Sequence, residues 1–202
     1  MKLLSIACLS ALAFSLTSIF SATEAAAQEP DGVRFRGGVA LEAGPLIVPG
    51  SFTVGVAGVQ GQLGVQINNE FGVYVVPSLD AVFGSVGGIN IAAALLVDYT
   101  LHDNLTFGVG PDVGVFGAIG STVAGALAGA GGALYGARLH FTWNPVFSRG
   151  PNGIRRKGLA VGMDLRLLGG GAGYATLSSS SGTASASAFV MAPMFTVGYQ
   201  AF

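Results

Sequence analysis

Few residues of this 202-residue chain are of types that perform chemistry. The two histidines, His102 and His140, lack the Ser, Cys or carboxylate pattern of a nucleophile and its base. Cys8 is the only cysteine and lies near the amino end, so a compact soft-metal site is not expected. The glycine run 169–171 resembles part of a phosphate loop, but no Lys-Ser or Lys-Thr pair follows it. We therefore expect no enzymatic activity, no cofactor and no metal site.

The remaining reactive residues are charged side chains that recur at one parity of strand-like segments. Because isolated charges are costly to bury, basic and acidic residues that share an enclosed face are expected to form paired, hydrogen-bonded networks. His140 shares this face with Arg138 and is predicted to be a hydrogen-bonded residue of the same interior. The predicted interior polar network is Arg34, Arg36, Glu42, Asp80, Asp98, Asp112, Arg138, His140, Asp164 and Arg166.

The segments that carry these residues alternate apolar with polar or small side chains. In one of them, Phe107, Val109 and Val113 occupy one parity, whereas Thr106 and Asp112 occupy the other. A period of two with one apolar face is typical of membrane-spanning barrel strands. The expected strands are 33–43, 52–67, 72–84, 87–101, 105–117, 131–143, 158–168 and 188–202.

Composition supports a surface that faces lipid. The chain is 51% hydrophobic and only 9% charged, and it contains 33 glycines; soluble domains carry about 25% charged residues. After the amino-terminal segment, no unbroken apolar stretch resembles a spanning helix. Helices and closed barrels are the structures that satisfy their backbones in lipid. The predicted fold is therefore all-β, a transmembrane antiparallel up-and-down β-barrel of eight strands.

The amino end predicts export. Lys2 precedes an uncharged, mostly apolar segment over 3–20, and small residues at Ala25 and Ala27 match a cleavage site. Cleavage after Ala27 removes Lys2 and Glu24 from nine basic and ten acidic residues, which leaves eight and nine. This balance gives no reason to expect nucleic acid as a partner. The two predicted parts are a signal peptide, 1–27, and a barrel domain, 28–202.

The carboxyl end is strand-like and finishes on Phe202. Because of this end and of the alternation described above, the chain resembles the small eight-stranded outer-membrane barrels, the class that contains OmpX, OmpW-like proteins and the OmpA membrane domain. The resemblance implies an outer-membrane location, contact with membrane lipid, and an assembly signal at Tyr199 and Phe202 read by the barrel assembly machinery. This chain departs from the pattern in phase, because Phe195 and Val197 lie on the opposite parity from Phe202.

Turn residues at 68–70 and 102–104 predict short connections at the periplasmic end, which also holds both termini. The outer connections are expected at 45–50, 84–88, 118–130 and 169–187; for the glycine-rich 118–130, a short helix or a strand extension remains open. The second strand changes apolar parity after Val56, which predicts a bulge near Gly58 or Gly61. The connection over 144–156 is long for a periplasmic turn.

Aromatic residues are expected to form two girdles at the membrane interfaces. The predicted periplasmic girdle is Phe35, Phe71, Tyr99, Phe107, Phe141, Trp143 and Tyr199, and the predicted outer girdle is Phe52, Phe83, Phe116, Tyr135 and Phe189.

Three functions fit these features. A structural or surface-interaction barrel is favoured, with a surface partner reached through the outer loops. The first alternative is a narrow pore for small solutes. The second is an envelope assembly factor that uses the basic run Arg149, Arg155, Arg156 and Lys157.

Overall fold

The fold is an all-β structure in a computed structural model that describes residues 33–84, 87–102, 104–121, 127–145, 147–150, 153–176 and 184–201. It contains nine strands within these ranges. Their bounds are β1 (Arg34–Val48), β2 (Phe52–Gln66), β3 (Phe71–Phe83), β4 (Gly87–His102), β5 (Leu105–Ser121), β6 (Leu127–Trp143), β7 (Phe147–Gly150), β8 (Gly153–Thr176) and β9 (Ala184–Ala201). None of the described segments is a helix long and apolar enough to cross a membrane.

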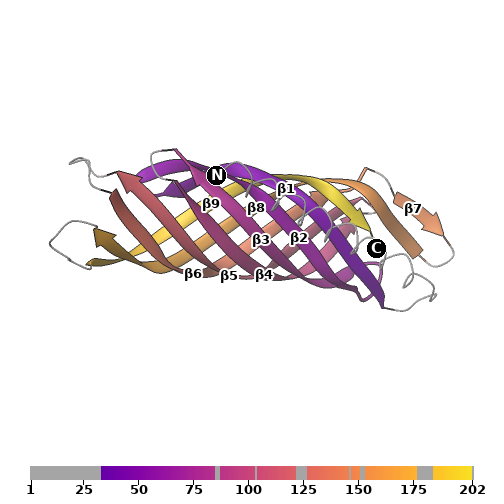
Figure 1. The fold of residues 1–202 in the computed structure, drawn as a ribbon. Coiled ribbons are helices and arrows are strands. Elements are labelled where there is room, and N and C mark those ends of the chain that lie inside the picture. Colours follow the sequence, from indigo (N-terminus) through magenta and orange to yellow (C-terminus); the bar gives the residue numbers. More distant parts are fainter. Residues whose placement is uncertain are drawn as a thin grey trace.

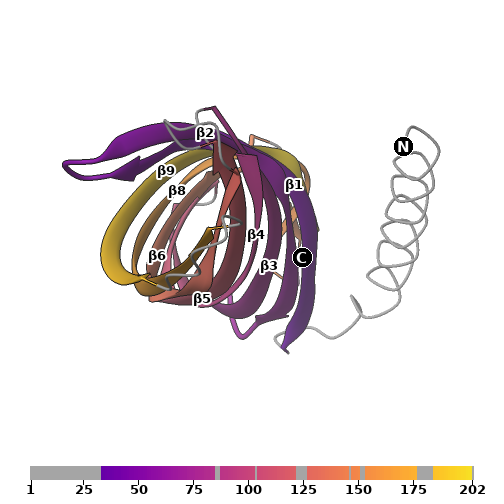
Figure 2. The ribbon, with the colours of Figure 1, turned by 60° about the vertical axis from the view of Figure 1, so that its left-hand side comes forward.

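Eight of these strands form a closed ring. From β1 to β6 each strand pairs antiparallel with the next; β6 then pairs with β8, β8 with β9, and β9 with β1. The strand β7 pairs with β8 as a short hairpin outside the ring. Figures 1 and 2 show the tilted strands and the closed wall. The predicted eight-stranded up-and-down barrel is confirmed. We call the end with Arg34 and Ala201 the terminal end, and the opposite end the loop end.

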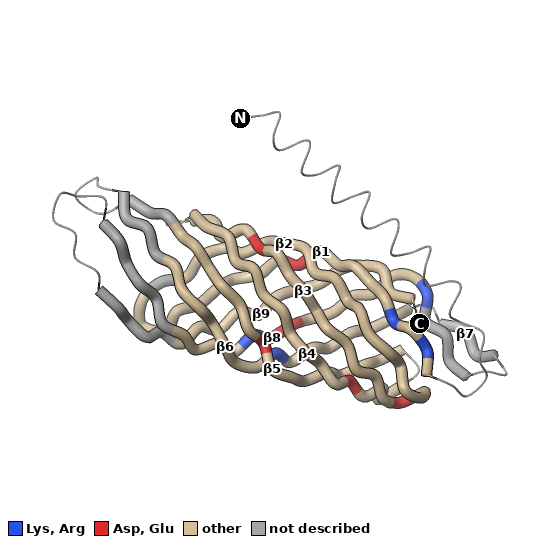
Figure 3. Tube along the Cα trace, turned by 60° about the horizontal axis from the view of Figure 1, so that its bottom comes forward, with Lys and Arg blue, Asp and Glu red and all other residues tan. Residues whose placement is uncertain are grey.

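The wall separates side chains by parity, as the alternation predicts. In β4, Ile91 and Leu95 face outward and are about half exposed, whereas Ala94, Leu96 and Asp98 are buried inside. Large apolar side chains are exposed in the same way on all eight ring strands. We call this outward surface the apolar belt. Figure 3 shows few charged positions along the described wall, with acidic and basic segments close together near the middle of the barrel.

Strands β1, β5, β6, β8 and β9 extend further toward the loop end than predicted. The predicted loop 45–50 is wrong in part, because β1 continues to Val48. Within 118–130, Ala118 pairs with Ala130. For the described positions, the predicted loop is therefore wrong and the alternative of a strand extension is correct. Within 169–187, Gly171 pairs with Ser187. These segments are rich in Gly and Ala, whose backbones extend the ladder although their side chains give little alternation. Positions 85–86, 122–126 and 177–183 lie outside the described residues.

The predicted bulge in the second strand is wrong. The register between β1 and β2 is continuous from Arg34–Gln66 to Val48–Phe52. Val54 and Val56 therefore face inward, where Val56 packs against Ala192 and Met194. The apolar parity changes along β2 because the interior itself becomes apolar toward the loop end.

At the terminal end, the outward aromatic residues form a row. Phe71, Tyr99, Phe107 and Phe141 occupy directly paired positions on β3, β4, β5 and β6, and each is about 40% exposed. The Phe71 and Tyr99 ring centroids are 5.1 Å apart. Trp143 is exposed to a similar degree near the end of β6. This row matches the girdle predicted for this end of the barrel.

At the loop end, Phe83, Tyr135 and Phe189 face outward and are more than half exposed. The prediction that Phe116 belongs to this outer girdle is wrong. Phe116 packs inside the barrel against the cluster of Leu134, Leu168 and Val190, because its even position in β5 faces the lumen. The side chain of Phe52 lies outside the described residues.

The seam between the first and last strands is interrupted. The β1–β9 pairs run from Gly37–Ala201 to Ala43–Phe195 and resume at Ile47–Met191. The same register places Pro45 opposite Pro193, and neither proline has a backbone N–H to donate. The last β1–β9 pair is Ile47–Met191, so Ala184–Val190 of β9 pair only with β8 among the described strands. In Figure 2, the tip of the β1–β2 hairpin leaves the ring above β9.

We predict that this seam is the first part of the wall to open. In hydrogen–deuterium exchange, peptides covering 44–48 and 190–194 should exchange faster than a peptide covering 133–140, whose pairings on both sides are continuous. The double substitution P45A/P193A restores two donors and should slow exchange at the seam alone. Equal protection of the seam and of 133–140 in the unsubstituted protein would contradict this prediction.

Candidate functional site: the charged lumen

The interior of the barrel has a polar region toward the terminal end and an apolar region toward the loop end. All ten predicted interior residues are buried, with exposed fractions of 9% or less. They lie on the inward parity of β1, β3, β4, β5, β6 and β8. An eight-stranded barrel has an interior just wide enough to be filled by side chains. The site is therefore a packed set of polar groups rather than an open channel.

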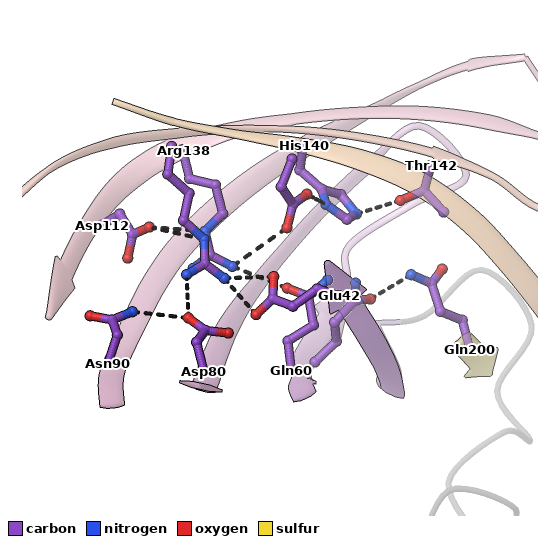
Figure 4. Close-up of polar contacts among 12 residues, drawn as sticks. Glu42, Gln60, Asp80, Asn90, Asp112, Arg138, His140, Thr142 and Gln200 are labelled. Carbon is purple, nitrogen blue, oxygen red and sulfur yellow. Dashed lines mark hydrogen bonds and ion pairs between the residues drawn. The ribbon is translucent and has the colours of Figure 1, made fainter. Parts of the chain in front are cut away.

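Arg166 of β8 connects to two strands that are not its neighbours in the ring, β1 and β3. Its Nη2 donates to both carboxylate oxygens of Glu42 on β1, at 2.6 Å each, and its Nη1 donates to Asp80 Oδ2 on β3 at 2.8 Å. Asn90 of β4 also donates to Asp80 Oδ2, at 2.9 Å. Figure 4 shows Glu42, Asp80 and Asn90 among the polar contacts of the lumen. One guanidinium thus joins three strands, of which β3 lies on the opposite side of the ring from β8.

Arg138 of β6 forms the second centre. Its Nε donates to Asp112 Oδ2 at 3.0 Å, and its Nη1 donates to Gln60 Oε1 at 3.1 Å. The same Nη1 lies 3.6 Å from Asp164 Oδ2. Because Arg166 Nε lies 4.0 Å from Asp112 Oδ2, the two centres form one cluster. We call the six charged residues of this cluster the lumen network: Glu42, Asp80, Asp112, Arg138, Asp164 and Arg166.

The lumen network holds four carboxylates and two guanidinium groups. Its side chains are 3% exposed or less, so water screens their charges weakly. His140 stands beside the network, and its Nδ1 shares a hydrogen bond with Asp164 Oδ1. Several acceptors and donors, including Asp112 Oδ1 and Arg138 Nη2, have no partner within the described protein atoms. The network is therefore closely packed, but protein groups alone do not satisfy all of it.

His140 also places a hydroxyl, an imidazole and a carboxylate in a line. Its Nε2 shares a hydrogen bond with Thr142 Oγ1, while its Nδ1 contacts Asp164. This order resembles the hydroxyl–histidine–carboxylate set of hydrolases. The adjacent cavity, lined among others by Gln62 and Gln200, has a volume of about 10 Å³. That volume is close to the room that one water needs.

Three of the ten predicted residues lie outside the central cluster, toward the terminal end. Arg36 pairs with Asp98, and its guanidinium carbon lies 4.2 Å from the centroid of the Tyr74 ring. Arg34 Nη2 donates to Asn69 Oδ1 at 2.6 Å, near the turn between β2 and β3. The predicted set therefore divides into a central cluster and a smaller group at the terminal end.

Uncharged polar residues complete the interior, and they are not among the ten residues predicted from the sequence. Gln200 Nε2 donates to Gln62 Oε1 at 2.6 Å, and Asn144 Nδ2 lies 3.4 Å from Gln200 Oε1. They share the inward parity of the charged residues, so parity was the available clue. The omitted buried residues with side-chain hydrogen bonds are Gln60, Gln62, Gln66, Asn90, Thr142, Asn144 and Gln200; Gln66 donates to the backbone oxygen of Asn68 in the turn after β2.

The described residues include no group of three or more His, Cys, Asp or Glu side chains placed to hold a metal ion. Tyr199, predicted to belong to the assembly signal, lies on the outward parity of β9 opposite Leu159. Phe202 and the predicted cleavage residues Ala25 and Ala27 lie outside the described residues. The whole predicted signal peptide, 1–27, lies outside them as well.

No family model matches the chain, and no curated protein matches it. Among solved structures, the chain is similar to the translocator domain of the autotransporter NalP from Neisseria meningitidis. The two are 10% identical over 95% of this chain and 97% of that chain, with a TM-score of 0.37. Both values are low, and the fold of this chain is established by its own strand pairing: a closed eight-stranded antiparallel barrel whose polar groups are packed inside.

Proposed function

We propose that this protein is an outer-membrane β-barrel that serves as a structural or surface-interaction scaffold, with a closed lumen and no catalytic activity. The observation that carries the proposal is the inverted distribution of side chains. The belt exposes apolar residues such as Val97, Val113 and Phe195, while the lumen network is buried inside. A water-soluble barrel would gain nothing from this arrangement, whereas lipid favours it.

Two barriers in series support a closed lumen. The lumen network crosses the barrel from β1 and β3 to β6 and β8. Toward the loop end, Leu134, Leu168 and Val190 form an apolar cluster, with Leu46 and Phe116 packed against it. Ions would have to pass charged groups that are already paired with one another, and then an apolar constriction. A scaffold whose work is done by its lipid-facing wall and outer loops is the function this geometry supports best.

A narrow pore is the second candidate. Asp112 Oδ1, Asp164 Oδ2 and Arg138 Nη2 lack hydrogen-bond partners among the described protein atoms, although each is buried. Buried polar groups normally find a partner, and ordered water supplies it where no protein group does. A chain of such waters through the polar region would be the starting point of a conducting path.

Conductance across a planar lipid bilayer separates these two functions. We predict that the refolded mature chain gives no steady current in potassium chloride, because both barriers stay in place. The triple variant E42Q/D80N/R166M removes the charges of one centre and should give small, frequent openings if the network is the main barrier. Steady single-channel current from the unsubstituted barrel would contradict the closed lumen and favour the pore.

A further inference from the structure

The interior on the loop-end side of the lumen network is lined by apolar side chains. Two clusters meet there, and we call their members together the apolar section: Leu46, Val48, Val56, Val82, Phe116, Leu134, Leu168, Val190, Ala192 and Met194. Leu134, Leu168 and Val190 are buried, whereas Leu46, Val48 and Phe116 are only partly buried. Apolar surface that stays uncovered beside polar groups commonly marks a place where an apolar ligand binds.

Small inward residues leave room next to the apolar section. Gly88 pairs with Ala118, Gly132 pairs with Phe116, and Gly170 pairs with Leu134. Gly88, Ala118, Gly132 and Gly170 have no side chain larger than a methyl group, and all four are partly exposed. The interior of an eight-stranded barrel is wide enough to be filled by side chains or to hold one small ligand. At this level, side chains therefore fill the interior only in part.

The seam between β1 and β9 borders the apolar section. The ladder between these strands lacks three successive pairs, where the register places Pro45 opposite Pro193. Other interruptions of the wall, beside Pro77 and Pro111, lack two pairs each. Leu46 lies within the interrupted part of the seam and packs against both apolar clusters. The weakest part of the wall thus lies directly beside the apolar interior.

The seam is closed by contact rather than by ladder hydrogen bonds. A Cβ atom on Gly44 would lie 2.0 Å from the backbone oxygen of Pro193, so the two strands touch there. On the outer side, Leu41 and Phe195 of the apolar belt are 66% and 64% exposed. Strands that share no backbone hydrogen bonds can separate in an apolar medium without leaving newly broken bonds unsatisfied. The apolar section is therefore continuous with the lipid-facing belt whenever the seam opens.

We propose that the apolar section binds one hydrocarbon chain of a membrane phospholipid, which enters from the bilayer between β1 and β9 at Pro45 and Pro193. This inference rests on the proposed membrane location. Continuity with the apolar belt selects this ligand, because a polar ligand would lose its hydration among side chains that offer it no hydrogen bond. The bound chain covers Leu46, Val48 and Phe116, and it reinforces the barrier to ions.

The test uses the mature chain, deuterated except at its Leu and Val methyl groups, in nanodiscs of phosphatidylcholine with deuterated acyl chains. The probe is a lysophosphatidylcholine with one protonated chain, and nuclear Overhauser cross-peaks from this chain to the methyl groups report direct contact. We expect cross-peaks to the outward Val113 and also to the inward Leu134 and Leu168. Val76, which is fully buried outside the apolar section, should show none.

Two matched variants locate the bound chain. The substitution A118F places an aromatic ring in the space beside the apolar section, so it should abolish the cross-peaks to Leu134 and Leu168 while leaving those to Val113. The control V115F adds the same ring to the outward face of the same strand and should leave the inner cross-peaks in place.

A disulfide tests the route of entry. The only cysteine of the chain, Cys8, lies in the predicted signal peptide, so P45C/P193C introduces the only two thiols of the mature protein. Oxidation joins the two strands across the seam. It should slow the appearance of the inner cross-peaks about 10-fold relative to the reduced form of the same variant, which corresponds to a barrier higher by about 1.4 kcal/mol.

The outcomes are separable. A barrel without cross-peaks to Val113 would overturn the proposed membrane location and this inference with it. Cross-peaks to Val113 with none to Leu134 or Leu168, or cross-peaks from water at these two methyl groups, would overturn the apolar site alone. Inner cross-peaks that persist in A118F would have the same meaning. Equal rates in the oxidised and reduced forms would show that the chain enters from the water at the loop end, which contradicts the seam as the route.

Discussion

Replacement of Arg166 by methionine should lower the free energy of unfolding of the refolded barrel by about 3–5 kcal/mol, the usual cost of removing one partner from a buried ion pair. Arg166 is the only described cation within hydrogen-bond distance of Glu42 and Asp80, whose side chains are fully buried. Without it, these carboxylates would remain inside the barrel with no guanidinium in hydrogen-bond contact. Urea unfolding followed by circular dichroism measures the change.

The control for this prediction removes the charges together. The variant E42Q/D80N/R166M leaves no unpaired charge at that centre, so it should recover most of the lost stability, because a buried network can often be replaced by neutral groups at little cost. If R166M proves as stable as the unsubstituted barrel, the lumen network does not contribute to folding. The barrier to ions would then have to be ascribed to the apolar cluster of Leu134, Leu168 and Val190.

Substitution of Val113 by arginine should cost about 2–4 kcal/mol, the measured range for a basic side chain at the bilayer midplane of a barrel. Val113 is 56% exposed on the outer face of β5 and lies well inside both ends of that strand. In lipid, the guanidinium group of an arginine at this position would have no polar partner. Unfolding in vesicles, compared with the unsubstituted chain, measures the difference.

A matched variant separates lipid contact from a general loss of strand propensity. Val33 is 61% exposed just before β1 at the terminal end, where an arginine can reach water and headgroups. V33R should cost about 0–1 kcal/mol, the value expected near the interface. Equal costs for V113R and V33R would show that the two positions meet the same solvent, which contradicts the apolar belt as a lipid-facing surface.

The alternation of side chains was enough to predict the barrel, its eight-stranded ring and the face on which each charged residue lies. This is because a period of two is a local property that the closed wall does not change. Parity also placed Arg36 and Asp98 on one inward face. It could not predict that Arg166 contacts Glu42, because partners across the lumen depend on the stagger of the strands around the ring.

Other features were missed for physical reasons that individual residues show. Val54 and Val56 suggested a bulge only because the lumen was assumed to be polar along its whole length. The Gly- and Ala-rich ends of β5, β6 and β8 have few large side chains, so they lacked the alternation that identifies a strand. The pairing of β7 with the start of β8 was missed because Gly150, Pro151 and Gly153 are residues typical of loops.

The most direct test of the membrane-embedded barrel uses Trp143, the only tryptophan of the chain. It lies on the outward parity near the end of β6 and is 42% exposed. In vesicles whose lipids carry bromine at known depths, we expect bromine close to the headgroups to quench its fluorescence most strongly, bromine near the bilayer centre to quench it weakly, and iodide in the water to have little effect. Efficient quenching by iodide with no effect of brominated lipid would place Trp143 in water and contradict the proposed barrel in the membrane.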